Sequence, residues 1–126
     1  MLPDEKNAAL LWDMLVHARE VLGFVAGKTY EDYRENRLLR LAVERLVQII
    51  GEAAYCVSRP YRDANPQIPW MPIMKQRHIL VHDYGVIDDE RIWRVATIHV
   101  AALIPLVESL LPPTPPDPFP EISGKP

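Results

Sequence analysis

The positions of the prolines limit what this 126-residue chain can fold into. Seven of its 13 prolines lie between Pro112 and Pro126, and four more lie between Pro60 and Pro72. Proline lacks the amide donor that a helix interior needs, and its ring clashes with the preceding turn. We therefore expect residues 112–126 to form an extended polyproline-II tail. Residues 1–111 remain as one folded domain of ordinary size.

Apolar side chains recur at helical spacing through the first half of this domain. The first helix is expected over residues 4–26, with Gly27 as its stop. Thr29 is a good N-cap for the second helix, and Asp32 three residues later resembles a capping box. The pattern predicts that this second helix is long and runs unbroken to residue 57, where Pro60 ends it.

Two more helices are expected in the second half of the domain. The third covers residues 68–84, and the fourth begins at Asp88 or Asp89 and continues to the proline tail. Pro105 is the only proline inside a helical pattern and should kink the fourth helix near Ala101. The chain has no useful stretch of alternating polar and apolar residues. The prediction is therefore an all-α protein, an up-down bundle of four main helices.

Composition excludes several classes of protein. Apolar residues make up 48% of the chain, which is too many for a disordered segment. A single cysteine, Cys56, rules out an internal disulfide framework, and we expect it to be a buried, unreactive thiol. The sequence lacks an apolar run long enough for a membrane span and a basic, apolar leader at its start. The expected location is the cytoplasm.

Polar chemistry concentrates at the end of the predicted third helix, in residues 75–85. His78 and His82 are four residues apart and share a helix face, as paired imidazole ligands of a metal would. A third ligand would have to be Glu52 or Asp83, neither at a characteristic spacing. A metal-dependent enzyme is therefore one open reading of this segment.

A second reading combines Arg77 with His82. Cleaving RNA without a metal needs a base for the 2′-hydroxyl, an acid for the leaving 5′-oxygen and a cation for the charged transition state. Histidine transfers protons near neutral pH, and arginine matches phosphate oxygens with a fixed fork of donors. On a regular helix the two side chains would point about 140° apart. Either the helix unwinds at His82 or a second copy of the chain completes the site.

Four features resemble the HepT toxins of the HEPN family, also called the DUF86 group. Arg77, four intervening residues, His82, Asp83 and Tyr84 reproduce the Arg-x4-His-x-Tyr motif of that family. The segment 49–54, with Gly-Glu at its centre, and Ile-Pro-Trp at 68–70 are similar as well. Trp93 matches an aromatic residue of the last helix. Position 78 differs, because family members often carry asparagine there.

The resemblance implies a homodimeric HEPN bundle that acts as a metal-independent endoribonuclease toxin without a cofactor. It assigns catalysis to Arg77 and His82. It makes Tyr84 the target of an MntA-type nucleotidyltransferase antitoxin, which uses ATP to attach AMP and so silences the toxin. The pair would form a type VII-like toxin–antitoxin system. An alternative within the same family is a non-catalytic HEPN module that helps a nucleotidyltransferase to bind its substrate.

Several other residues carry weaker expectations. Glu52 could be a buried carboxylate that pairs with Arg77 or His82, while His78 and Asp83 could support the site by tuning its charge. Trp70, Trp93, His17 and His99 are expected in the core or at a dimer interface, and Arg34, Arg37 and Arg40 on a salt-bridged, solvated face. Residues 59–82 hold four basic side chains against one acidic one in a chain of net charge -3, so RNA attraction there is possible.

Overall fold

A computed structural model describes residues 4–82 and 87–112 of the chain. The helices of the first half are α1 (Glu5–Val25), α2 (Tyr30–Glu35), α3 (Arg37–Cys56) and α4 (Arg59–Ala64). Those of the second half are α5 (Trp70–His82), α6 (Asp89–Arg94), the π-helical turn η2 (Val95–His99) and α7 (Val100–Glu108). These described residues contain no strand, which confirms the predicted all-α class.

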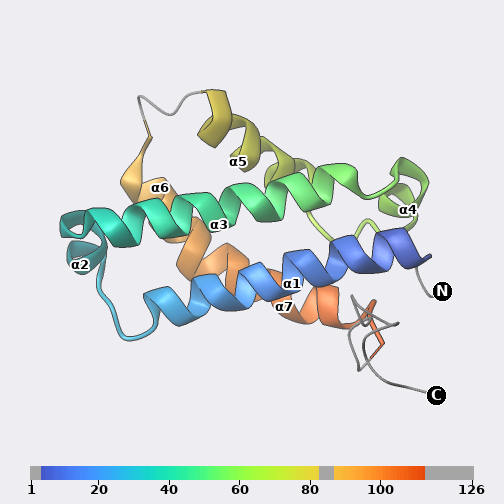
Figure 1. The fold of residues 1–126 in the computed structure, drawn as a ribbon, viewed down its shortest axis with the longest axis horizontal. Helices are drawn as coiled ribbons and strands as arrows, with labels where there is room; N and C mark the ends of the chain where they lie inside the picture. The colour runs from blue at the N-terminus through green and yellow to red at the C-terminus, as the bar shows by residue number, and fades with distance from the viewer. Residues whose placement is uncertain (1–3, 83–86, 113–126) are drawn as a thin grey trace, which may run out of the picture.

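The four main helices run alternately up and down. In Figure 1, α1 and α5 run in one direction, while α3 and the continuous α6–η2–α7 rod run in the other. The central pair is α1 and α3; α5 packs on α3, and α7 and η2 pack on α1. This is the predicted up-down bundle. No helix in the described part of the chain is long and apolar enough to cross a membrane. The proline-rich segment 113–126 lies outside the described residues.

The first helix has the predicted bounds within one residue. Asp4 caps α1 by accepting a hydrogen bond from the backbone nitrogen of Asn7 at 2.7 Å. Gly27 follows the helix with a φ of 72°, the left-handed conformation that favours glycine. Asn7 is buried, and its amide exchanges two hydrogen bonds with Ser58 (3.0 and 3.1 Å). This pair fastens the start of α1 to the turn between α3 and α4.

The prediction of one unbroken second helix is wrong, because Asn36 divides it into α2 and α3. The Thr29–Asp32 capping box is present as expected. Asn36, however, adopts an extended backbone, and its side chain accepts a hydrogen bond from the backbone nitrogen of Leu39 at 3.0 Å. Asparagine competes in this way with helical backbone bonds. The break lets Tyr33 turn into the core, where its ring lies 5.4 Å from that of Trp93.

Two expectations at the end of α3 are also corrected. Pro60 does not end that helix, which stops at Cys56; it lies in the first turn of α4, where its missing donor costs nothing. Cys56 is exposed instead of buried. The last core positions of α3 are Ala53 and Ala54, and the apolar stripe has rotated away before Cys56.

The fourth helix departs from α geometry earlier than expected. Asp88 caps α6 as predicted, with its carboxylate 3.2 Å from the backbone nitrogen of Arg91. The irregular turn is η2 at residues 95–99, while α7 continues through Pro105. A π-turn adds a residue to the turn and shifts the register of the side chains that follow. His99, expected in the core, is consequently exposed.

Candidate active site

The predicted site lies on α5, whose first residue is held by the core. Trp70 is buried, and its indole nitrogen donates a hydrogen bond to the backbone oxygen of Asn65 at 3.0 Å. Leu80, near the other end of the helix, is buried as well. These contacts fix the rotation of α5, so that Arg77 lies on the flank nearest α3. The other aromatic expected in the core, Trp93, packs on Tyr30 and Tyr33.

Gly51 brings α3 and α5 into close contact at Arg77. A Cβ atom at Gly51 would lie 2.3 Å from the Cβ of Arg77 and 3.1 Å from the backbone oxygen of Ile73. Both distances are shorter than ordinary van der Waals contact, so this position excludes any side chain. Glycine is otherwise unfavourable in a helix interior. Its presence in the middle of α3 is therefore explained by the position of Arg77.

The Arg77 side chain is positioned without a charged partner. Its guanidinium carbon lies 5.6 Å from the ring centroid of Tyr55, within the range of a cation–π contact. Its Nε atom is buried and has no hydrogen-bond partner among the described residues. The ion pairs found in the described ranges do not include Arg77. The positive charge is therefore available to an anion.

Glu52, expected to pair with Arg77 or His82, has a different partner. Its carboxylate accepts a hydrogen bond from the Gln48 amide at 3.2 Å on the same helix, and the residue is half-buried. Within residues 4–82 and 87–112, no hydrogen bond or ion pair joins Glu52 to Arg77 or His82. The residue that does contact the guanidinium, Tyr55, was not predicted from the sequence.

His82 is the last residue of α5 and is exposed. The helix remains α-helical up to His82, so the structure does not show the unwinding that would turn this side chain towards Arg77. The imidazole instead stacks beside that of His78, with 4.5 Å between ring centroids. On one regular helix, Arg77 and His82 point about 140° apart. Asp83 and Tyr84 lie outside the described residues.

The metal reading lacks a third ligand in the described structure. No group of three or more His, Cys, Asp or Glu side chains within residues 4–82 and 87–112 is arranged to hold a metal ion. His78 and His82 are therefore a pair of rings without a further ligand from these ranges. Asp83, one of the two candidates for a third ligand, is not among the described residues.

The basic side chains of α2 and α3 largely follow expectation. Arg34 pairs with Glu31 at 2.6 Å, and Arg40 lies 3.9 Å from Asp89. All four are at least partly exposed, so these pairs form a solvated face. The expected basic stretch from residue 59 to residue 82 lies on α4 and α5, and Arg77 belongs to it.

Fold and site together define the class of protein, a small four-helix bundle that presents an arginine and a histidine five positions apart on its third main helix. A family model described as "Ribonuclease HepT-like" matches residues 14–110. The chain belongs to the HepT-like ribonuclease family, in the HEPN group to which its motifs were assigned.

Curated relatives with the same designation cover most of the chain. A Methanocaldococcus jannaschii protein named "Putative RNase" is 34% identical over 87 residues, which are 69% of this chain and 80% of the relative. A second protein of that organism with this name is 26% identical over 110 residues, 87% of this chain and 91% of the relative. "Probable ribonuclease HepT" of Thermococcus cleftensis is 28% identical over 74 residues, 59% and 67% of the two chains. No solved structure matches the chain significantly.

Proposed function

We propose that this protein is a metal-independent endoribonuclease in which Arg77 and His82 carry out catalysis. The observation that carries the proposal is the Arg77 side chain. It belongs to the motif of a ribonuclease family, and its charge has no acidic partner among the described residues. The basic stretch around it gives RNA a local attraction that the net charge of -3 would otherwise oppose.

The chemistry follows from the two side chains. His82, as a neutral imidazole, takes the proton of a 2′-hydroxyl while the 2′-oxygen attacks the adjacent phosphorus. The bond from phosphorus to the 5′-oxygen breaks, and an imidazolium returns a proton to that leaving oxygen. The products are a 2′,3′-cyclic phosphate and a 5′-hydroxyl. Arg77 donates charge-assisted hydrogen bonds to the phosphate oxygens as negative charge develops on them. This scheme needs no cofactor.

We infer that two copies of the chain build each site. Within one copy, Arg77 and His82 point to different sides of a regular α5. The outer face of α3 beside α5 keeps Leu38, Leu41 and Tyr55 exposed, at 80%, 45% and 61%. Such a run of exposed apolar surface is typical of an interaction site. A homodimer formed through this face would bring the Arg77 of one copy near the His82 of the other.

The same proposal covers regulation. We infer that the protein is a cytoplasmic toxin and that an MntA-type nucleotidyltransferase antitoxin silences it by transferring AMP from ATP to Tyr84. Each transfer joins the phenol oxygen to the α-phosphorus and releases pyrophosphate. Tyr84 is two residues beyond His82. The added phosphate would compete with RNA for Arg77, and the adenine would occupy space beside the site.

Cleavage in the presence of EDTA tests the catalytic proposal. Purified protein should cut RNA under these conditions, and Arg77→Ala or His82→Ala should lower the rate by at least about a hundredfold. Arg59→Ala and His17→Ala are matched controls, because they remove the same side chains elsewhere, and they should stay active. Full activity in either site variant would refute the assignment.

Incubation with the nucleotidyltransferase and ATP distinguishes a regulated toxin from a non-catalytic binding module. Mass spectrometry should show whole AMP increments on wild-type protein and none on Tyr84→Phe, and the modified protein should lose RNA cleavage. A module that only accompanies the nucleotidyltransferase would show no cleavage before modification and no increment on Tyr84.

A further inference from the structure

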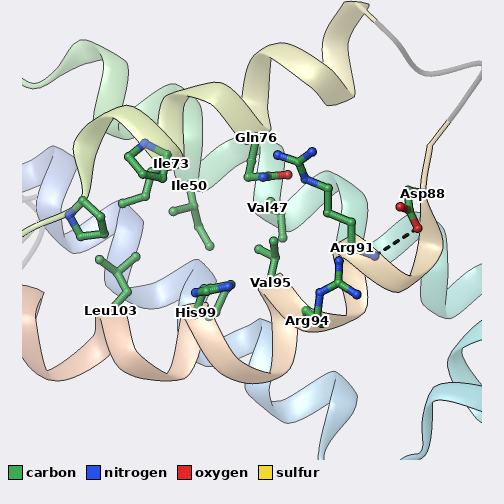
Figure 2. A pocket seen from close by; sticks show the side chains of 13 residues that line it. Val47, Ile50, Ile73, Gln76, Asp88, Arg91, Arg94, Val95, His99 and Leu103 are labelled. Atoms are coloured by element: carbon green, nitrogen blue, oxygen red, sulfur yellow. Dashed lines mark hydrogen bonds between the residues drawn. The ribbon is translucent and has the colours of Figure 1, made fainter.

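A cavity separates α5 from the rod formed by α6, η2 and α7. It has a volume of about 500 Å³, and α3 forms its floor. Figure 2 shows Val47, Ile50 and Ile73 facing Val95 and Leu103 across it. Cavities of roughly 300–1,000 Å³ with apolar walls and a few polar groups are typical of small-ligand sites. The catalytic scheme above does not use this cavity.

The rim of the cavity is positively charged. Arg91, Arg94 and His99 line it, and Asp88 is the only acidic residue among the described residues that do. The Asp88 carboxylate is already engaged as the cap of α6. The contact of Arg94 with Glu90 is long, at 3.9 Å, and both side chains are more than half exposed. Such a pair contributes little and leaves the arginine free to bind an anion.

Arg91 is held by a neutral group. With the amide of Gln76 turned so that its oxygen faces the guanidinium, that oxygen accepts hydrogen bonds from Nε at 3.2 Å and Nη2 at 3.0 Å. No carboxylate within residues 4–82 and 87–112 forms an ion pair with Arg91. The arginine is therefore oriented at the mouth of the cavity while its charge remains uncompensated.

The cavity is also adjacent to the candidate active site. Pro72, Gln76 and Arg91 line both the cavity and the surface hollow that contains Arg77, His78 and Tyr55. A ligand that extends from Arg77 past Gln76 would reach the mouth of the cavity. Its chemistry must combine an anionic group for the rim with a flat apolar body for the walls.

We propose that the cavity binds one ribonucleotide of the RNA substrate, beside the nucleotide that is cleaved. The base packs against Val47, Ile50 and Leu103, and the phosphate lies between Arg91 and Arg94. His99 is placed to hydrogen-bond to a base edge, as side chains do when they read unstacked RNA bases. This inference rests on the proposed ribonuclease function and adds a site that selects the sequence to be cut.

Binding of single nucleotides to the full chain, followed by NMR, tests the proposal without any turnover. AMP, CMP, GMP and UMP are each titrated, and at least one should shift the signals of Val47, Val95 and Leu103. The matching nucleoside, which lacks the phosphate, should bind more weakly. Val95→Trp fills the cavity and should abolish these shifts. Arg94→Glu should weaken binding about tenfold or more, as expected for losing a charge-assisted contact.

Arg34→Glu is the matched control. Arg34 is 52% exposed and Arg94 56%, each beside a glutamate about one turn away, but Arg34 does not line the cavity. Equal weakening in both variants would reveal unspecific charge and overturn the proposal, as would unchanged binding in Val95→Trp. If that variant fails to fold, Arg94→Glu and Arg91→Gln carry the test. Loss of binding at raised protein concentration would mean that a second copy fills the cavity, which also contradicts it. RNA cleavage without nucleotide binding refutes only this site, and binding without cleavage refutes only the catalytic proposal.

Discussion

Gly51 leaves the space that the first carbon of the Arg77 side chain fills, so this contact links the candidate site to the packing of α3 on α5. Gly51→Ala should lower the free energy of unfolding by about 1–3 kcal/mol, the usual cost of overpacking. RNA cleavage should fall too, because α5 must move. Urea unfolding and a cleavage assay measure the two effects.

Gly23→Ala is the matched control for that change. Gly23 lies in α1, and no atom lies within 4 Å of the position that a Cβ would take there. Alanine at this position should stabilise the protein by about 0.5–1 kcal/mol, since glycine is unfavourable in a helix interior. Equal stability of Gly51→Ala and Gly23→Ala would contradict the close approach of the two helices.

Tyr55 offers a second test at the scale of single residues. Tyr55→Phe keeps the aromatic face under the Arg77 guanidinium, whereas Tyr55→Leu removes it. We expect normal cleavage in the first variant and a loss of about two- to fivefold in the second, in line with a cation–π contact of about 0.5–1 kcal/mol. Tyr55 is 61% exposed, so neither change should affect unfolding by more than about 0.5 kcal/mol. Identical kinetics in the two variants would exclude a role for the ring.

The sequence identified Arg77 and His82 but not the contact between Arg77 and Tyr55. The first two belong to a local motif, which a sequence displays directly. Tyr55 lies on a different helix, and only the packing of α5 on α3 brings it to the guanidinium. Gly51 carried a signal that could have been used, since a glycine in the middle of an apolar helix usually has a packing reason.

At the scale of elements, the break between α2 and α3 depends on one side chain. Asn36→Ala removes the acceptor for the backbone nitrogen of Leu39 and should destabilise the protein by about 0.5–2 kcal/mol. Thermal or urea unfolding measures this loss. Asn36→Asp keeps an acceptor at the same place and should retain most of the stability. If the alanine variant is as stable as the wild type, the two helices can join without cost.

Glu44 gives the interface of α3 and α6 a pH dependence. Burial, and then the charge of Asp89, raise the pKa of this carboxyl above its ordinary value of 4.5, although Arg40 acts in the opposite direction. The folded state therefore holds the proton more tightly than the unfolded state. This group lowers stability as the pH rises from its unfolded pKa through its raised folded pKa.

Glu44→Gln should thus raise the free energy of unfolding at pH 7 and flatten its decrease above pH 4.5. Urea unfolding across that range measures both. Glu20→Gln makes the same chemical change at an exposed position of α1 and should leave the profile unaltered. A stability profile of Glu44→Gln that parallels the wild type would show that the carboxyl carries no such penalty.

Helix periodicity predicted four main helices and most of their ends. It missed the break at Asn36 because the residues on either side continue the helical pattern, and the competing side-chain bond has no periodic signature. It misplaced His99 because the π-turn at residues 95–99 shifts the register of the last helix. Both errors arose where one local interaction overrides an otherwise regular pattern.

At the scale of the whole molecule, the four-helix bundle fixes α5 as a regular helix through His82. One chain then presents Arg77 and His82 on different sides of that helix, about 140° apart. The central claim is that a dimer unites the arginine of one copy with the histidine of the other. The apolar side chains left exposed on α3 give such a dimer a surface beside the site.

Mixing two inactive variants tests this claim most directly. Arg77→Ala and His82→Ala are each purified, mixed in equal amounts, allowed to exchange subunits and assayed for RNA cleavage in EDTA. Half of the dimers are then mixed, and each mixed dimer contains one intact and one doubly defective site. The mixture should recover about a quarter of wild-type activity, as two-fold symmetry requires. Activity no higher than that of the separate variants, with subunit exchange verified by mass spectrometry, would contradict a site shared between two copies.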